Sequence, residues 1–152
     1  MVKERYILIV VACIVLGIIV FEVKRSLKEV PVTDIGSVAG DRFAGVTSKG
    51  LLEKMENGDD FLLVDLRRPA EFREGHIKGA VNIPVGEIEN VYGTLSRDND
   101  IILYCTSGPW SRQAYRILQG KGFKKIRILV NGIVGWKWEV NGEVVASPSD
   151  AS

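Results

Sequence analysis

Histidine and cysteine are scarce in this chain of 152 residues, which contains one histidine and two cysteines. Cys13 and Cys105 lie in such different surroundings that a disulfide between them is not expected, and two cysteines cannot form a disulfide framework. Because His76 stands alone and no carboxylate–histidine cluster accompanies either cysteine, the sequence predicts no metal site. Twenty basic and nineteen acidic residues leave a net charge of +1 without a dense basic block, so we expect no nucleic-acid partner.

One long apolar run stands near the N-terminus, from Tyr6 to Phe21. About eighteen helical residues span roughly 27 Å, close to the thickness of a hydrocarbon core. Charged residues follow the run without a small-x-small cleavage site, which argues against a cleaved signal peptide. Val10–Cys13 resembles a lipobox, but the sequence stays apolar after Cys13. We therefore predict a retained single-pass anchor over residues 1–25, with the lipid bilayer as a partner.

The charges that flank this run bear on its orientation. Lys3 and Arg5, together with the α-amino group, favour a cytoplasmic N-terminus, whereas Lys24, Arg25 and Lys28 favour the opposite arrangement. We expect the C-terminal part of the chain on the extracytoplasmic, periplasmic side.

The rest of the chain has the pattern of a linker followed by one domain. Residues 26–45 contain Pro31 and several glycines and predict a linker, residues 46–147 a domain, and residues 148–152 a disordered tail. Within the domain, apolar runs of strand length alternate with helix-like segments, which predicts an α/β fold with a small parallel sheet and helices on both faces. The predicted strands are 61–64, 80–83, 101–104 and 126–130, and the predicted helices are 48–57, 87–95, 111–118 and 132–136.

The predicted strand 101–104 delivers Cys105 into a Gly/Pro-containing loop that leads to a helix. Sites in parallel sheets form at the carboxyl ends of the strands. Backbone N–H groups of such a loop and the positive end of the helix dipole stabilise a thiolate, which makes Cys105 a candidate nucleophile. The alternative is a buried structural cysteine at the end of a core strand. The loop residues are Thr106, Ser107, Gly108, Pro109, Trp110 and Ser111.

A second group of polar side chains follows the predicted strand 61–64. Asp65, Arg67, Glu71 and His76 are spaced so that they can bond one another and hold the loops, which is a supporting role. His76 is also able in principle to act as a general base. A histidine in a loop rich in carboxylates is more often a hydrogen-bonded structural residue, and we expect that role here.

Three motifs, in order, resemble those of the rhodanese domain. They are Asp-x-Arg-x3-Glu-Phe-x2-Gly-His-Ile-x-Gly-Ala-x-Asn-Ile-Pro from Asp65 to Pro84, Tyr-Cys-x-Ser-Gly-x-x-Ser from Tyr104 to Ser111, and Gly132-Ile133-x-x-Trp136. The resemblance covers about residues 45–146. It implies a rhodanese-like α/β fold and a catalytic Cys105 that carries a transient persulfide, with no other cofactor. It also implies transfer of sulfane sulfur from a donor such as thiosulfate to a thiol or another thiophilic acceptor, including a protein acceptor.

The loop departs from the family at two positions. Rhodanese-like loops often carry arginine directly after the cysteine and a second basic residue just before the serine, where this chain has Thr106 and Trp110. A dianion such as thiosulfate then loses charge-assisted contacts worth about 1.5–3 kcal/mol each. We therefore predict weak thiosulfate turnover and a neutral, bulky or protein-borne persulfide as partner. Arg112 either restores part of the positive potential or is an exposed surface residue, and Trp110 either contacts substrate or only covers the loop.

Two other functions stay open from the sequence. The missing cations suit a non-catalytic interaction or redox-sensing module. The related phosphatases and arsenate reductases use a Cys-x5-Arg loop, whose arginine clamps a tetrahedral oxyanion. In this chain the sixth residue after Cys105 is Ser111, and the first arginine, Arg112, comes one residue later. That spacing argues against phosphoryl or arsenate chemistry.

Overall fold

The computed structural model describes residues 43–147, which contain a five-stranded sheet of order β1-β6-β5-β2-β4. Every neighbouring pair in this sheet is parallel, as the buried apolar runs predicted. The strands are β1 (Gly45–Val46), β2 (Leu62–Asp65), β4 (Val81–Asn82), β5 (Ile101–Tyr104) and β6 (Ile126–Leu129). Two further short strands, β3 (His76–Ile77) and β7 (Val144–Val145), form an antiparallel pair that the sequence did not predict.

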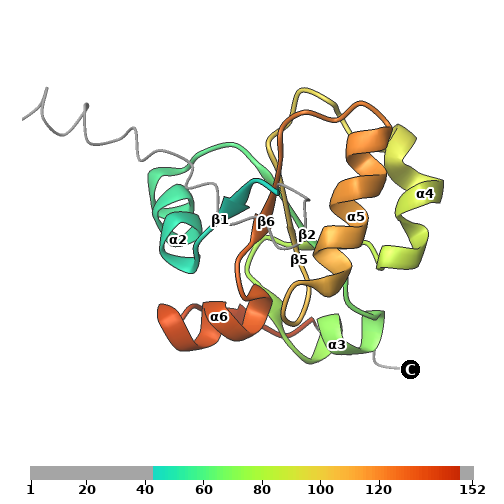
Figure 1. The fold of residues 1–152 in the computed structure, drawn as a ribbon. Coiled ribbons are helices and arrows are strands. Elements are labelled where there is room, and N and C mark those ends of the chain that lie inside the picture. The colour runs from blue at the N-terminus through green and yellow to red at the C-terminus, as the bar shows by residue number, and fades with distance from the viewer. Residues whose placement is uncertain (1–42, 148–152) are drawn as a thin grey trace, which may run out of the picture. The chain divides into compact units, whose positions relative to one another are not determined.

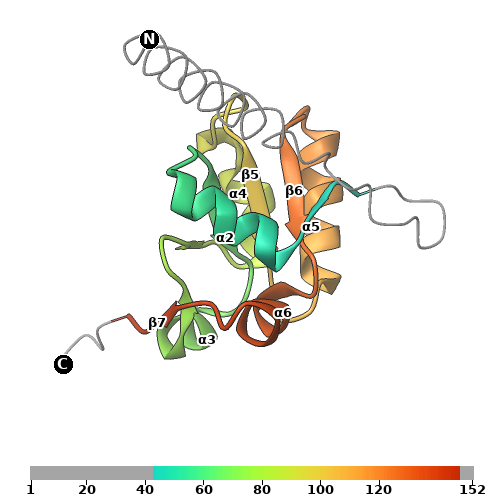
Figure 2. The ribbon, with the colours of Figure 1, turned by 90° about the vertical axis from the view of Figure 1, so that its left-hand side faces the viewer.

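Helices cover both faces of the five-stranded sheet, which confirms the predicted α/β architecture (Figure 1). One face carries α2 (Ser48–Asn57) and α6 (Gly132–Glu139), and the other carries α4 (Ile88–Val91) and α5 (Pro109–Gly120). The short helix α3 (Pro69–Glu74) lies with α6 towards one end of the domain, and β7 runs beside α3 (Figure 2). Two 3-10 turns, η1 (Val85–Glu87) and η2 (Tyr92–Thr94), flank α4.

The alternation of side chains along β5 positions Cys105. Ile101 and Leu103 belong to the hydrophobic cluster under α4 and α5, whereas Ile102 and Tyr104 belong to the cluster under α2 and α6. Successive strand residues point to opposite faces of a sheet, so the residue after Tyr104 returns to the face of Leu103. Cys105 accordingly belongs to the α4/α5 cluster. Its side chain is directed to the face on which α5 begins.

The helix signals in the sequence are accurate at α2 and right only in part over residues 87–95. Thr47 caps α2, with its Oγ1 accepting the N–H of Gly50 at 3.0 Å, and Gly58 ends the helix. The single helix expected over 87–95 is instead the series η1, α4 and η2. In this stretch Gly93 weakens helix propensity, and Ile88 is the only fully buried side chain of α4. One apolar anchor does not stabilise a longer helix.

Trp136 fastens the C-terminal segment to the domain. Its ring is 1% exposed, and its Nε1–H donates to the Glu143 carbonyl at 3.1 Å. The N–H of Gly142 in turn donates to the Trp136 carbonyl at 3.1 Å. The chain thereby turns back after α6, so that β7 reaches β3.

No helix among residues 43–147 combines the length and apolar character needed to cross a membrane. The predicted anchor over residues 1–25 lies outside the described residues, as do residues 26–42 of the predicted linker and the predicted tail at 148–152. Of the linker, the described part includes Phe43 and Ala44, which pack against the hydrophobic cluster under α5.

Candidate active site

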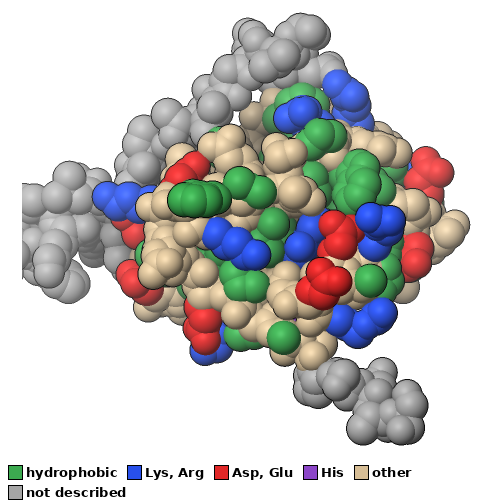
Figure 3. Space-filling view, turned by 90° about the horizontal axis from the view of Figure 1, so that it is seen from below, with side chains coloured by type: hydrophobic (Ala, Val, Ile, Leu, Met, Phe, Trp, Pro, Cys, Tyr) green, Lys and Arg blue, Asp and Glu red, His purple; other side chains and the backbone are tan. Residues whose placement is uncertain are grey.

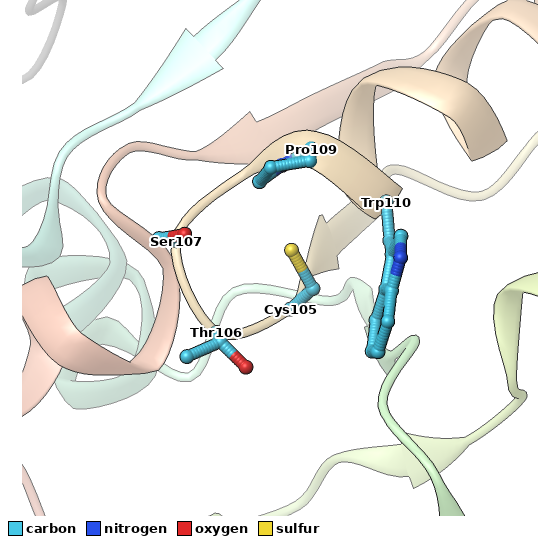
Figure 4. A pocket seen from close by; sticks show the side chains of 5 residues that line it. All are labelled: Cys105, Thr106, Ser107, Pro109 and Trp110. Carbon is cyan, nitrogen blue, oxygen red and sulfur yellow. The ribbon is translucent and has the colours of Figure 1, made fainter.

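Cys105 lies in the tight loop between β5 and α5, as the sequence predicted. The residue is 2% exposed, and its Sγ accepts the backbone N–H of Gly108 at 3.1 Å. Gly108 has φ 121°, a conformation that favours glycine, and this turn brings its amide back to the sulfur. Figure 4 shows Sγ pointing into the space that the loop encloses.

A pocket of about 260 Å³ opens above the sulfur. Its lining residues are Cys105, Thr106, Ser107, Pro109 and Trp110, and the Trp110 ring stands on the side of the sulfur opposite the loop (Figure 4). A water molecule occupies about 30 Å³ of liquid volume, so the pocket is several times larger than one added sulfur atom requires. None of the lining side chains is a cation. Cys105 is therefore buried and yet reaches a space that a second molecule can enter.

The N-terminus of α5 supplies further donors on the same side. Pro109 occupies the first helical position and has no N–H, and the first intrahelical bond runs from the Arg112 N–H to the Gly108 carbonyl at 3.1 Å. The N–H groups of Trp110 and Ser111 belong to the helical turn that has no intrahelical acceptors. The hydroxyl of Ser111 is fully buried and has no hydrogen-bond partner among the described residues. This end of α5 also carries about half a positive charge from the helix dipole.

Helix α6 holds the backbone of the loop from behind. The N–H of Ile133 donates to the Cys105 carbonyl at 3.0 Å, and the N–H of Val134 donates to the Thr106 carbonyl at 3.3 Å. Gly132, with φ 56°, allows this approach because a Cβ on it would lie 2.3 Å from the Cys105 carbonyl oxygen. Both loop carbonyl groups thus accept hydrogen bonds from the backbone of α6. The only sequence signal for this contact was the Gly132-x-x-x-Trp136 motif.

A buried ion pair supports β5 from the neighbouring strand. Asp65, which is fully buried, pairs in register with Tyr104, and Arg67 is 7% exposed. Nη2 of Arg67 donates to Asp65 Oδ2 at 2.6 Å and to the Gly75 carbonyl at 2.8 Å. Burial lowers the pKa of the Arg67 guanidinium, but the hydrogen bonds and the charge of Asp65 raise it by more. Arg67 therefore stays charged and ties the end of β2 to the residue before β3.

Tyr104 completes this support, and sequence reasoning did not single it out. Its hydroxyl oxygen accepts the N–H of Ile77 at 3.1 Å, and the Arg67 guanidinium lies 5.9 Å from the centre of its ring. Burial, reinforced by the nearby Asp65 carboxylate, raises the pKa of the Tyr104 hydroxyl above its ordinary range. Tyr104 is therefore a neutral side chain that links β5 to β3.

Glu71 and His76 do not bond to Asp65 or Arg67, but both are hydrogen-bonded structural residues, the role expected of them. The Glu71 carboxylate instead accepts the backbone N–H and the Nε–H of Arg68, both at 3.2 Å, at the start of α3. Nδ1 of His76 lies 2.8 Å from the Phe72 carbonyl and, since a carbonyl only accepts, carries the proton. The His76 ring stacks on that of Phe72 at a centroid distance of 3.6 Å. Both side chains therefore bond to residues three or four positions earlier in the chain.

Arg112 is exposed and does not line the pocket of Cys105. Its guanidinium lies next to the loop. A Cβ on Gly108 would be 3.1 Å from Arg112 Nη1. Thr106 and Ser107 are exposed at the rim, as expected of loop residues. Of the sequence-predicted site, the loop residues 106–111 gather around Cys105, and Asp65 with Arg67 supports β5. Glu71, His76 and Arg112 do not line the pocket.

Comparisons with known proteins agree with this geometry. Residues 47–139 match the family model for the rhodanese-like domain. The chain belongs to this family. The domain is 34% identical over 91 residues to a sulfurtransferase of Allochromatium vinosum, which covers 60% of this chain and 85% of that protein. It is 32% identical over 94 residues to the putative sulfurtransferase YtwF of Bacillus subtilis, covering 62% and 90% respectively.

Solved structures confirm the rhodanese-like fold. The crystal structure of a rhodanese-related protein from Thermoplasma volcanium superimposes with a TM-score of 0.61 at 27% sequence identity. That match covers 68% of this chain and 98% of the other. The fold that carries Cys105 is therefore similar to that of a solved rhodanese-related protein.

Proposed function

We propose that the chain is a sulfurtransferase or sulfur carrier that forms a persulfide on Cys105. The observation that carries the proposal is the position of Cys105 Sγ, which accepts the Gly108 amide at 3.1 Å and opens into a pocket of about 260 Å³. An amide donor and the positive end of α5 both face the sulfur and stabilise the negative charge that it carries during the transfer. The names of the similar proteins, sulfurtransferase and putative sulfurtransferase, support the same reaction class.

In the first step the Cys105 thiolate attacks the outer sulfur of a sulfane donor R–S–SH. A new S–S bond forms on Cys105, the S–S bond of the donor breaks, and the electron pair leaves with the thiolate R–S⁻. In the second step an acceptor thiolate attacks the terminal sulfur of the Cys105 persulfide and regenerates the Cys105 thiolate. The loop amides stabilise the terminal sulfur anion between the two steps, as an oxyanion hole stabilises an oxyanion.

The pocket favours donors other than thiosulfate. Its lining contains Thr106 and Trp110 at the positions where the family often has cations, and no lining side chain is positively charged. A dianion entering this space gains no charge-assisted bond from a side chain. We infer that the physiological donor is a neutral, bulky or protein-borne persulfide, and that thiosulfate turns over weakly.

Intact mass spectrometry after incubation with polysulfide tests the reaction. We expect the chain to gain one sulfur, and the gain to disappear in Cys105→Ser. Cys13→Ser is the matched control because it removes the other cysteine of the chain, and it should load normally. Absence of an adduct on the wild-type chain, or an adduct that survives in Cys105→Ser, would refute the proposal.

A non-catalytic interaction or redox-sensing role is the second candidate, and the cation-free pocket favours it. The same experiment separates the two roles when an acceptor such as cyanide or dithiothreitol is added. Repeated turnover supports the sulfurtransferase. Stoichiometric loading without turnover against any acceptor supports the sensing role.

We further propose that residues 1–25 tether the domain to a membrane, with residues 46–147 on the extracytoplasmic side. The support is the apolar run from Tyr6 to Phe21 and its flanking charges. Fractionation of the full chain tests the tether. Recovery in the membrane fraction, with release only by detergent, is expected, and recovery in the supernatant without detergent would overturn it. Protease accessibility in spheroplasts reports the orientation.

A further inference from the structure

A second pocket adjoins the one above Cys105. It has a volume of about 440 Å³, and its lining comprises Leu66, Arg68, Pro84, Val85, Gly86 and Trp110. Trp110 lines both pockets, so its indole is the wall that they share. The sulfur transfer described above uses none of the other five residues.

The lining of this second pocket has the character of a small-molecule site. Leu66, Pro84 and Val85 are apolar, Gly86 adds no side chain, and Arg68 is the only ionisable residue. Small-molecule sites typically have volumes of about 300–1,000 Å³ and combine apolar walls with a few polar groups that fix orientation. Figure 3 shows hydrophobic side chains next to Lys and Arg side chains across the end of the molecule that carries α3 and α6.

The Arg68 guanidinium has hydrogen-bond donors available for a ligand. Its Nε binds the Glu71 carboxylate at 3.2 Å, and its two terminal nitrogens have no hydrogen-bond partner among the described residues. The side chain is 78% exposed, so its guanidinium is accessible. Guanidinium groups bind carboxylates in pairs of parallel hydrogen bonds. A carboxylate is therefore the group that complements this pocket.

Backbone bonds hold the walls of the second pocket in place. The N–H of Val85 donates to the Leu66 carbonyl at 3.1 Å, and the N–H of Ile83 donates to the Asp65 carbonyl at 3.0 Å. The Asn82 amide also donates to the Arg67 carbonyl at 2.9 Å. The segments before and after α3 are thus joined, and the space between them is preformed rather than opened by a ligand.

We propose that the second pocket binds the body of the sulfur donor, a low-molecular-weight peptide persulfide with a free carboxylate. The carboxylate pairs with Arg68, the peptide crosses the Trp110 ring, and the outer sulfur reaches Cys105. The inference rests on the proposed sulfur transfer and names its donor class. It assigns the negative charge of the donor to a place remote from its sulfur, which agrees with the pocket at Cys105, whose lining among residues 43–147 contains no cation.

The reaction balances without a further reactant. The Cys105 thiolate takes the outer sulfur from the peptide persulfide, the S–S bond of the peptide breaks, and the peptide thiolate leaves with the electron pair. A proton from the persulfide or the solvent then neutralises the departing thiolate. Thiosulfate lacks a body that fills the second pocket and gains nothing from Arg68.

Single-turnover loading of the full chain tests the proposal, with glutathione persulfide and its diethyl ester as matched probes. The two probes share the peptide, but the ester has no carboxylate. In Arg68→Gln we expect the half-saturating concentration of glutathione persulfide to rise about fivefold to tenfold, with the limiting rate unchanged, because one exposed charge-assisted contact is lost. Loading from the diethyl ester and from polysulfide should change less than about twofold.

Two further variants make the test specific. Arg73→Gln removes an arginine of α3, the helix that follows Arg68; Arg73 does not line the pocket, and this variant should load like the wild type. Gly86→Asp adds a negative charge at a position where a new Cβ would meet nothing within 4 Å. This variant should raise the half-saturating concentration of glutathione persulfide but not that of its ester. Equal loading by wild type and Arg68→Gln, with polysulfide also active, would overturn the donor site and leave the sulfur transfer standing. Failure of every donor to load Cys105 would overturn both.

Discussion

Gly132→Ala tests whether α6 holds the active-site loop. The new Cβ would lie 2.3 Å from the Cys105 carbonyl oxygen and 2.6 Å from that of Thr106. Close C···O contacts in proteins are about 3.3 Å, so one element must retreat by about 1 Å. A shift of that size breaks the bonds from Ile133 and Val134, which measure 3.0 and 3.3 Å.

The expected loss of stability has two parts. An L-residue in the left-handed region costs about 1–2 kcal/mol, and the two lost hydrogen bonds cost about 0.5–1.5 kcal/mol each. We therefore expect the free energy of unfolding of Gly132→Ala, measured by urea denaturation, to fall by about 3 kcal/mol. Because the loop carbonyls are released, the rate constant for persulfide formation on Cys105 should also fall about tenfold or more.

Gly58→Ala is the matched control. Gly58 has φ +69°, close to that of Gly132, but a Cβ on it would meet nothing within 4 Å. The free energy of unfolding of this variant should fall only by the cost of the left-handed backbone conformation, about 1–2 kcal/mol, and persulfide should form on Cys105 at the wild-type rate. Equal losses of stability in the two variants, or an unchanged persulfide rate in folded Gly132→Ala, would refute the role assigned to α6.

Three further predictions concern charge. Asp65→Asn leaves Arg67 buried without its partner and should lower the free energy of unfolding in urea by about 3 kcal/mol or more; a loss below about 1 kcal/mol would contradict this. Trp110→Arg should raise kcat/KM for thiosulfate about tenfold in a steady-state cyanide assay, because the dianion gains one charge-assisted contact; no increase would show that charge does not limit turnover. The Asn131 amide donates to the Glu139 carboxylate at 2.8 Å and lowers the pKa of Glu139 from its ordinary 4.5, so the stabilisation is present above pH 4.5 and is lost as the pH falls through the lowered pKa. The stability difference between wild type and Glu139→Gln, at most about 1 kcal/mol, should be measurable at pH 7 and vanish near pH 3, whereas a pH-independent difference would contradict this.

The sheet and the position of Cys105 were predictable because both depend on local patterns. Short apolar runs bounded by polar turns gave four of the strands to within one or two residues, and a cysteine after such a run lies at the functional edge of a parallel sheet. Capping residues gave α2 for the same reason, since Thr47 and Gly58 act on their own helix.

The parts that were missed depend on distant segments. The β3–β7 pair joins residues almost seventy positions apart, and each strand has two residues, too few for a periodic pattern. The bonds of Glu71 and His76 were mistaken because spacing shows which groups are near in sequence and not how α3 turns them. The second pocket combines Leu66 and Arg68 with residues 84–86 and Trp110, and no single segment reveals it.

The loop also indicates how the proposed persulfide would be stabilised without an arginine side chain in the pocket lining. A persulfide carries one negative charge, and the end of α5 offers about half a positive charge together with amide donors. The carbonyls of Cys105 and Thr106, whose dipoles would oppose an anion, are bound by α6. Thiosulfate carries a second negative charge, which neither the end of α5 nor the binding of the loop carbonyls by α6 neutralises. In the proposed complex a peptide persulfide places its carboxylate at Arg68, on the far side of Trp110. We therefore expect this pair of pockets to select a donor by the distribution of charge along it rather than by its total charge.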